Sequence, residues 1–203
     1  EVLEIDENEL AEGCIDLLAI NYNSLATIDD GSCLYSQTIP LISGWNLMST
    51  HINPELADII DVFSSLTSDL VIVKNNNGDA YLPEWSYNGI GDMLIGEGYQ
   101  LKINTTSDLL ITGERIFPAL NPIAIEEGWS LIAYLRLEPV LANLALQDLT
   151  ENNNLIIAKD NYGNAYLPEW DFNGIGNFES GSGYQLKTSN IDTLLYLSDD
   201  ESY

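Results

Sequence analysis

Positive charge is the scarcest feature of this sequence. The 203 residues include 6 Lys and Arg against 32 Asp and Glu, which gives a formal net charge of -26. Such a chain repels phosphate backbones and anionic lipid surfaces. We therefore expect that it neither binds nucleic acid nor inserts directly into a membrane. No apolar run approaches the roughly 18 residues that span a bilayer, and the acidic start lacks the features of a signal peptide. We therefore expect a soluble, mature or excised part of a longer precursor.

Residues that commonly carry catalysis are also few. The chain has one His, His51, and it has no Gly-x-Ser-x-Gly, His-Glu-x-x-His or phosphate-loop spacing. A Ser-His-Asp triad would therefore depend on His51 alone. The abundance of acids leaves a pair of catalytic carboxylates, facing each other across a cleft, as an alternative that counting does not decide. We predict a protein that is not an enzyme.

The two cysteines, Cys14 and Cys33, lie in a polar, turn-rich segment. We predict that they form a disulfide, because closing a loop of this size contributes roughly 3 kcal/mol to a segment too small to have its own core. A disulfide would place the protein in an oxidising, extracellular compartment. The alternative is a pair of reduced thiols, since His and Cys are too few for a zinc site.

The loop between the cysteines is rich in side-chain oxygen atoms. Calcium takes roughly six to eight hard oxygen ligands, and this composition favours a Ca²⁺ ion as the cofactor. The candidate ligands are Asp16, Asn21, Asn23, Asp29 and Asp30. The alternative is that these side chains only form turns, by hydrogen-bonding to the nearby backbone.

An internal duplication is the strongest signal in the sequence. Gly78 to Lys102 aligns without gaps on Gly163 to Lys187, with 17 identical pairs in 25. A repeat of this length indicates two copies of one folding unit. We predict three parts, which are an acidic disulfide-closed cap or linker over residues 1–37, repeat 1 over 38–117 and repeat 2 over 118–203.

The fold class predicted for each repeat is mainly β with one short helix, a β-rich α+β unit. Several short strands with Gly-containing turns favour two tandem small barrel-like or sandwich-like repeats. The helix is predicted to begin near Pro54 and Pro139, and in the first repeat its apolar face is formed by Leu56, Ile59, Ile60 and Phe63. Asn77-Gly78 and Tyr162-Gly163 are predicted to supply positive φ angles at hairpin turns.

Matched aromatic residues form the second candidate site. Exposed rings in a groove bind sugars by stacking, whereas buried rings fill a core. We predict that Trp85 and Trp170 are buried at a structural corner, so that replacing either one with Ala unfolds its own copy. The alternative ligand-binding set is Tyr81, Trp85, Tyr87, Tyr166, Trp170 and Phe172.

The four lysines also recur at matched positions, as Lys74 with Lys159 and Lys102 with Lys187. We predict a structural role, either in ion pairs with Glu84 and Glu169 or with their stems packed on aromatic rings. Ligand binding is the alternative.

Two motifs carry a resemblance to known modules. Residues 13–33, GCIDLLAINYNSLATIDDGSC, resemble a short repeat with the pattern C-x-D-x-x-A-x-N-Y-N-x-x-A-x-x-D-D-G-S-C in large exported proteins of Bacteroidetes-type bacteria. The repeats resemble a second module of such proteins, with the pattern G-W-N-L-x-S, then I-V-K-x-x-x-G-x-x-Y-x-P, then N-x-I-G, then G-x-G-Y-Q. The resemblance implies secreted or surface-anchored adhesins and exoenzymes, often exported by the type IX route. No basic sorting tail follows Leu197, so anchoring is expected to be encoded elsewhere.

Together these features predict a non-enzymatic structural or adhesive module of a secreted or cell-surface bacterial protein. It would mediate surface attachment or space other domains. The expected partners are other domains or subunits of a large surface protein, and surface glycans or proteins. The alternative function is a carbohydrate-binding accessory module of an exported enzyme.

Overall fold

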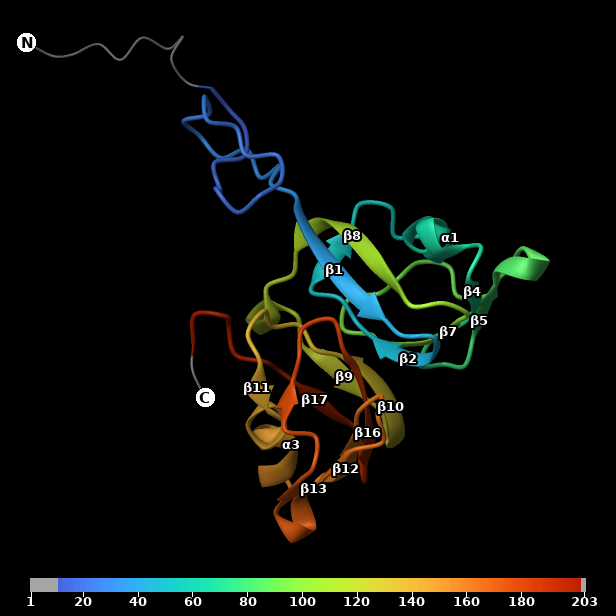
Figure 1. Ribbon diagram of the computed structural model, residues 1–203. Helices are drawn as coiled ribbons and strands as arrows, with labels where there is room; N and C mark the ends of the chain where they lie inside the picture. The colour runs from blue at the N-terminus through green and yellow to red at the C-terminus, as the bar shows by residue number, and fades with distance from the viewer. Residues whose placement is uncertain (1–10, 202–203) are drawn as a thin grey trace, which may run out of the picture.

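The computed structural model describes residues 11–201. The first ten residues of the predicted cap and the last two of the second predicted repeat lie outside the described residues. Figure 1 shows a small N-terminal cap, drawn in blue, followed by two β-rich halves that pack against each other. We call residues 35–117 the N-terminal half and residues 118–201 the C-terminal half. The prediction of a mainly β fold is confirmed, with several antiparallel sheets.

The N-terminal half contains a five-stranded sheet and a three-stranded sheet. The five-stranded sheet has the order β2-β7-β4-β5-β6, and the three-stranded sheet has the order β1-β8-β3. Alternate residues of β7 are buried, as the two-residue period of a strand requires. The strands are β1 (Tyr35–Leu41), β2 (Gly44–Met48), β3 (Ile52–Pro54), β4 (Leu70–Lys74), β5 (Ala80–Leu82), β6 (Tyr87–Asn88), β7 (Tyr99–Ile103) and β8 (Ser107–Arg115).

The C-terminal half also contains a five-stranded sheet, with the order β10-β16-β12-β13-β14. Two smaller pairs, β9 with β17 and β11 with β15, complete its strands. The bounds are β9 (Ile123–Ile125), β10 (Gly128–Ala133), β11 (Val140–Leu141), β12 (Leu155–Lys159), β13 (Ala165–Leu167), β14 (Phe172–Asn173), β15 (Asn177–Phe178), β16 (Gly183–Thr188) and β17 (Asp192–Leu194).

The two five-stranded sheets agree in register as well as in order. Trp45 of β2 pairs with Lys102 of β7, and Trp129 of β10 pairs with Lys187 of β16. The pairing of β4 with β7 shifts register near its start, and so does the pairing of β12 with β16. Within residues 11–201 no sheet closes on itself, because β2 and β6, like β10 and β14, remain the ends of open sheets. The barrel-like alternative is therefore wrong.

The predicted helices are shorter and begin later than expected. Pro54 lies in β3, opposite Gly113 of β8, and Pro139 precedes β11. Helix α1 covers only Ile59–Val62, and a 3-10 turn, η2 (Ser64–Leu66), follows it. The C-terminal half has two short helices, α2 (Ala142–Ala145) and α3 (Gln147–Glu151), instead of one.

The helix prediction failed because a strand pairing competes for the same residues. The β3 pairing with β8 holds the chain extended through Pro54. The helix starts only where the Asp58 carboxylate accepts a hydrogen bond from the Ile60 N–H group at 2.8 Å, as an N-cap does. Ile59 and Phe63 are buried, but Leu56 and Ile60, which were assigned to the same apolar face, are exposed.

The predicted hairpins between β4 and β5 and between β12 and β13 are confirmed. Gly78 and Gly163 have positive φ angles of 86° and 85°. Asn77 and Tyr162 are not among the positive-φ residues, so the glycine alone supplies the left-handed conformation.

Each half has its own hydrophobic core. In the C-terminal half, the Tyr134 ring meets Phe178 and Tyr196 edge to face, with centroids 5.8 and 5.3 Å apart. The stacked rings of Phe178 and Tyr184 extend this cluster. Such aromatic contacts add about 0.5–1.5 kcal/mol per pair beyond area burial.

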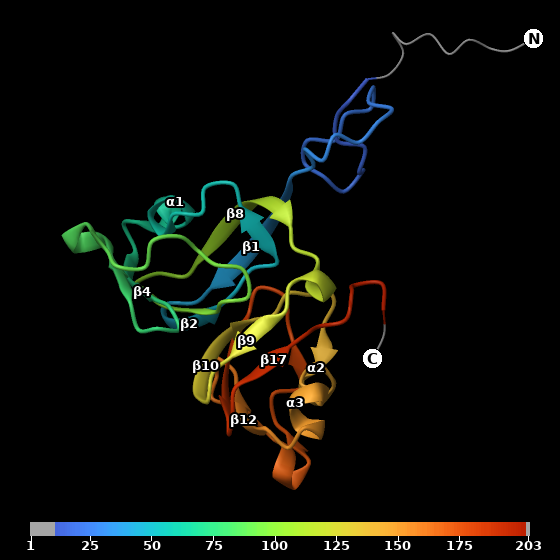
Figure 2. The ribbon, with the colours of Figure 1, turned by 180° about the vertical axis from the view of Figure 1, so that it is seen from behind.

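The halves join along a line of backbone contacts that we call the seam. Met48 bridges Ser182, and Glu97 bridges Ile132. The Asn76 side-chain oxygen accepts a hydrogen bond from the Leu131 N–H group at 2.6 Å. Reciprocally, the Asn161 side-chain oxygen accepts one from the Leu47 N–H group at 2.9 Å. Each half therefore makes the same contacts with the other, as at the interface of a two-fold symmetric dimer. Figures 1 and 2 show the two halves packed against each other at the centre of the molecule, where β2 contacts β16.

Two glycines allow this close approach. A Cβ atom on Gly98 would lie 2.6 Å from the Ile132 carbonyl oxygen, and one on Gly183 would lie 2.6 Å from the Met48 carbonyl oxygen. The neighbouring atoms belong to the backbone and cannot rotate away. The seam therefore requires glycine at both positions.

We expect Gly98→Ala and Gly183→Ala to destabilise the chain by about 3 kcal/mol, the upper end of what overpacking costs. Gly128→Ala is the control, because its Cβ would meet nothing within 4 Å and only its positive φ of 97° costs energy, about 1–2 kcal/mol. Thermal unfolding measures the difference. Melting of both seam variants at or above the temperature of Gly128→Ala contradicts the prediction.

Candidate functional site

The cap is closed by the predicted disulfide, which is confirmed between Cys14 and Cys33 with an S–S distance of 2.04 Å. Among its hydrophobic residues from position 11 onward, only Cys14 and Ala19 are buried. The cap therefore has almost no core, and the covalent bond is its main constraint.

Each predicted calcium ligand in the cap accepts a hydrogen bond from a nearby backbone N–H group. The five contacts are Asp16 with Leu18, Asn21 with Leu34, Asn23 with Leu25, Asp29 with Gly31 and Asp30 with Ser32, all between 2.8 and 3.1 Å. Four of them join residues two apart and form turns, whereas the Asn21 contact joins residues 13 apart in the sequence. Across residues 11–201, no group of three or more His, Cys, Asp or Glu is arranged to hold a metal ion. The calcium site stays a prediction.

One carboxylate of the cap has a second partner. The Tyr35 hydroxyl donates a hydrogen bond to the Asp16 carboxylate at 2.7 Å. This contact lowers the pKa of Asp16, with help from the Leu18 N–H group. Burial and the same hydrogen bond raise the pKa of Tyr35 to about 12. The contact links the cap to the first strand of the N-terminal half.

Calorimetry with and without a chelator tests calcium binding to the cap. If the ion binds, the melting temperature rises with Ca²⁺ concentration, because a ligand specific to the folded state stabilises it. Asp29→Asn and Asp30→Asn should then reduce the shift. The absence of both binding heat and a melting shift at millimolar Ca²⁺ rejects the ion and leaves the turn interpretation.

The matched aromatic sequences form two projecting turns, which we call the aromatic tips and define as residues 83–87 and 168–172. The predicted buried corner is wrong, because the exposed fractions of Trp85 and Trp170 are 72% and 70%. Tyr87 and Phe172 are also exposed, whereas Tyr81 and Tyr166 are buried below them. Figures 1 and 2 show the tips at separate ends of the molecule, one on each half.

Local sequence explains why the tips project. Pro83 and Pro168 begin the 3-10 turns η3 (Pro83–Trp85) and η5 (Pro168–Trp170), which carry the tryptophans off the sheets. The next residues, Ser86 and Asp171, have left-handed φ angles of 49° and 47°. A non-glycine residue pays roughly 1–2 kcal/mol for this conformation. Strain of this kind concentrates at functional sites.

Three of the four lysines pack on the other pair of tryptophans. The Lys74 ammonium lies 5.4 Å from the Trp45 ring centroid. The ammonium groups of Lys159 and Lys187 lie 5.1 and 5.9 Å from the Trp129 centroid. Their observed partners are therefore these indole rings rather than the predicted Glu84 and Glu169. Sequence analysis missed Trp45 and Trp129 as site residues, although their matched pairing was a usable signal.

These residues belong to an outward sheet surface that we call the Lys–Trp face. Its members alternate with buried residues along β2, β4 and β7 and along β12 and β16. In β10, Trp129 is exposed, whereas Leu131 is buried where the two halves meet. The members of the face are Trp45, Leu47, Ile72, Lys74, Gln100 and Lys102 in the N-terminal half, and Trp129, Leu131, Ile157, Lys159, Gln185 and Lys187 in the C-terminal half. The two parts meet at a hollow of about 240 Å³ whose lining includes Lys74, Gln100, Trp129 and Gln185.

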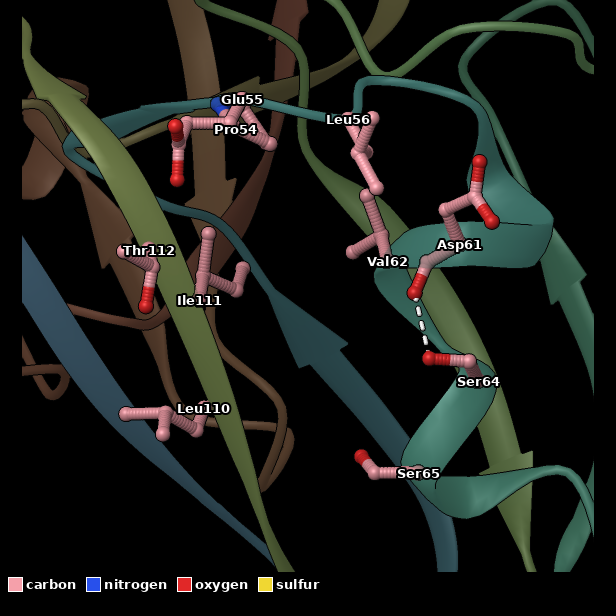
Figure 3. Close-up of a pocket in the computed structure, with 10 residues that line it drawn as sticks. All are labelled: Pro54, Glu55, Leu56, Asp61, Val62, Ser64, Ser65, Leu110, Ile111 and Thr112. Atoms are coloured by element: carbon pink, nitrogen blue, oxygen red, sulfur yellow. Dashed lines mark hydrogen bonds between the residues drawn. The ribbon is translucent and has the colours of Figure 1, made fainter.

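Another hollow, of about 320 Å³, lies between α1, η2 and β8 in the N-terminal half. Figure 3 shows its two carboxylates, Glu55 and Asp61, on opposite sides, and they do not converge on a common point. The marked hydrogen bond runs from the Ser64 hydroxyl to the Asp61 carbonyl oxygen at 2.7 Å and only closes the end of α1. This arrangement does not provide the facing pair of acids that a hydrolase requires.

His51 links the halves. Its Nδ1 atom lies 2.9 Å from the Ser180 hydroxyl oxygen, which also accepts a hydrogen bond from the Gln37 amide at 3.2 Å. The imidazole is only 8% exposed. Burial lowers the pKa of His51 from 6.5 to about 4, although the negative charge of Asp199 acts to raise this pKa. His51 is therefore neutral at pH 7 and acts as a hydrogen-bonding element of the seam.

We expect His51 to make stability pH-dependent. Because its folded-state pKa is depressed, the unfolded chain binds the proton first as pH falls from 6.5 towards 4, and stability is lost over that window. The loss from this group is about 3 kcal/mol. Melting curves between pH 7 and pH 4 should show a smaller loss for His51→Asn than for the parent. Parallel pH profiles for the two chains contradict the assignment.

Comparison with family models, with curated proteins and with solved structures found no significant match. Among residues 11–201, no helix has the length and apolar character needed to cross a bilayer. The resemblance to modules of exported surface proteins therefore stays a prediction, and the candidate sites must be interpreted from their geometry.

Proposed function

We propose, first, that the two halves are copies of one folding unit that associate as an internal dimer. The supporting observations are the 17 identities in 25 aligned positions, the common strand order of the five-stranded sheets, and the reciprocal Asn76 and Asn161 contacts at the seam. On this view repeat 1 covers residues 38–117 and repeat 2 covers 118–203, behind a cap over residues 1–37.

The function that we propose is a non-enzymatic attachment module of a secreted or cell-surface protein. The observation that carries it is the exposure of matched tryptophans on two separate tips, Trp85 and Trp170. Exposed tryptophans are favoured anchors in protein and glycan interfaces because they offer a large, rigid contact area. Two tips on one body engage a surface twice, which raises apparent affinity without new contacts.

An extracellular location is part of this proposal. The Cys14–Cys33 disulfide supports it, since disulfides persist in oxidising compartments. The high negative charge favours solubility of such a module in salty water, where its self-repulsion is screened. The partners on this view are other subunits of a large surface assembly or molecules on a facing surface.

Replacing both tip tryptophans, as Trp85→Ala with Trp170→Ala, tests the proposal. We expect unfolding free energy to change by no more than about 0.5 kcal/mol per site, because the side chains are exposed. We expect binding to a glycan array and to a panel of immobilised surface proteins to be lost. Single variants should retain weak binding, because one tip remains.

Tyr162→Ala is the matched control. Tyr162 is an exposed aromatic residue on the β12–β13 turn, but its counterpart in the N-terminal half is Asn77. Equal binding losses in Tyr162→Ala and in the double tip variant would argue against a specific role for the tips. So would unchanged binding of the double variant.

The second candidate is a carbohydrate-binding accessory module of an exported enzyme. It is favoured by the same exposure of Trp85 and Trp170, because flat rings stack on the apolar faces of sugars. The array distinguishes the two, since binding to neutral glycans alone, lost in the tip variants, supports the carbohydrate module. Binding to proteins alone supports the attachment module.

A further inference from the structure

The Lys–Trp face is more alike in the two halves than the core beneath it. The outward residues of β2, β4 and β7 are Trp45, Leu47, Ile72, Lys74, Gln100 and Lys102, and the same residue types occupy all six corresponding positions of β10, β12 and β16. Some buried neighbours differ, such as Asn46 against Ser130 and Val73 against Ala158, while others, such as Leu101 and Leu186, are identical. Substitutions at surface positions usually cost little stability. Leu131 is buried at the seam, but packing alone does not account for the other five identities, whose members are all partly or fully exposed.

This face also gathers the positive charge of the chain. All 4 lysines lie on it, and none of its twelve residues is acidic. The rest of the chain carries 2 arginines against 32 acids, which is a charge of 2 - 32 = -30. At physiological salt, charges farther away than about 8 Å are largely screened. A polyanion can therefore bind at this face, although the molecule as a whole repels it.

The indole rings contact three of the four ammonium groups, those of Lys74, Lys159 and Lys187. Lys159 and Lys187 both lie within 6 Å of the Trp129 centroid, at 5.1 and 5.9 Å. Two ammonium groups beside one ring form a preorganised site for an anionic group, because contact with the ring reduces the freedom that binding would otherwise remove. Trp129 remains 49% exposed, so part of the indole is free to contact a ligand.

The face continues across the seam. Lys74 and Gln100 from one half and Trp129 and Gln185 from the other line one hollow of about 240 Å³. The two amides each offer both donors and an acceptor, which suits hydroxyl groups. Cations, amides and indoles repeated over six strands match an extended ligand with anionic groups, hydroxyl groups and apolar ring faces. We propose that the Lys–Trp face binds an acidic polysaccharide. This site is separate from the aromatic tips and extends beyond the attachment function.

Calorimetry of the full chain with polygalacturonate and with dextran sulfate tests the proposal and distinguishes carboxylate from sulfate as the anionic group. We expect binding to at least one of these polymers that weakens as salt concentration rises. Carboxyl-reduced polygalacturonate, which keeps the sugar chain but not its charge, should bind more weakly. Poly-L-glutamate, which has carboxylates without sugar rings, should also bind more weakly.

Lys159→Gln with Lys187→Gln should lower the affinity roughly tenfold or more, because two charged contacts are lost. Lys159→Arg with Lys187→Arg keeps the charge and the contact with the ring, and it should retain binding. Ser36→Asp with Asn190→Asp is the charge control. It also makes the chain more negative by two charges, but at exposed positions outside the face, so we expect unchanged affinity.

Four results overturn the proposal: no binding to either acidic polymer, binding of poly-L-glutamate as strong as that of the polysaccharide, unchanged affinity in the lysine-to-glutamine variant, or an equal loss in the charge control. The second of these results assigns the face to an acidic protein partner instead. None of them bears on the aromatic tips, because Trp85 and Trp170 are unchanged in every variant.

Discussion

Backbone contact between the two halves is the constraint on which the rest of this structure depends. Gly98 and Gly183 let the backbones of the two halves approach closely. A Cβ atom at either position would lie only 2.6 Å from a carbonyl oxygen of the other half. Around these glycines, asparagine side chains from each half satisfy backbone N–H groups of the other. Buried backbone groups need such partners, so the contact is specific as well as close. The seam fixes how the sheets are placed, and therefore where both candidate sites lie.

The seam has opposite consequences for the two sites. It brings the outer faces of the sheets together, so that Lys74 and Gln100 share a hollow with Trp129 and Gln185. It leaves the aromatic tips apart, one on each half. A continuous face suits one extended ligand, whereas separated tips suit two contacts with a surface. In a chain of net charge -26, the fold concentrates all 4 lysines on the Lys–Trp face.

The errors of sequence interpretation have physical causes. Hydrophobic spacing predicted a helix from Pro54, but pairing with β8 holds that segment extended, since tertiary hydrogen bonds outweigh local propensity. Aromatic side chains in a small domain usually enter the core, which is why Trp85 and Trp170 were expected to be buried. The proline-initiated turns instead lift them into solvent, while Tyr81 and Tyr166 take the buried positions.

The sequence by itself determined the features that depend on local or repeated pattern. These are the mainly β composition, the matched segments, the Gly78 and Gly163 turns and the Cys14–Cys33 pairing. Only the tertiary structure decided which of the paired tryptophans are exposed at tips and which pack under lysines. It also decided that Gly98 and Gly183 lie where the two halves make contact. The reason is that a repeated sequence specifies how each unit folds, whereas the arrangement of two units depends on contacts between residues far apart in the chain.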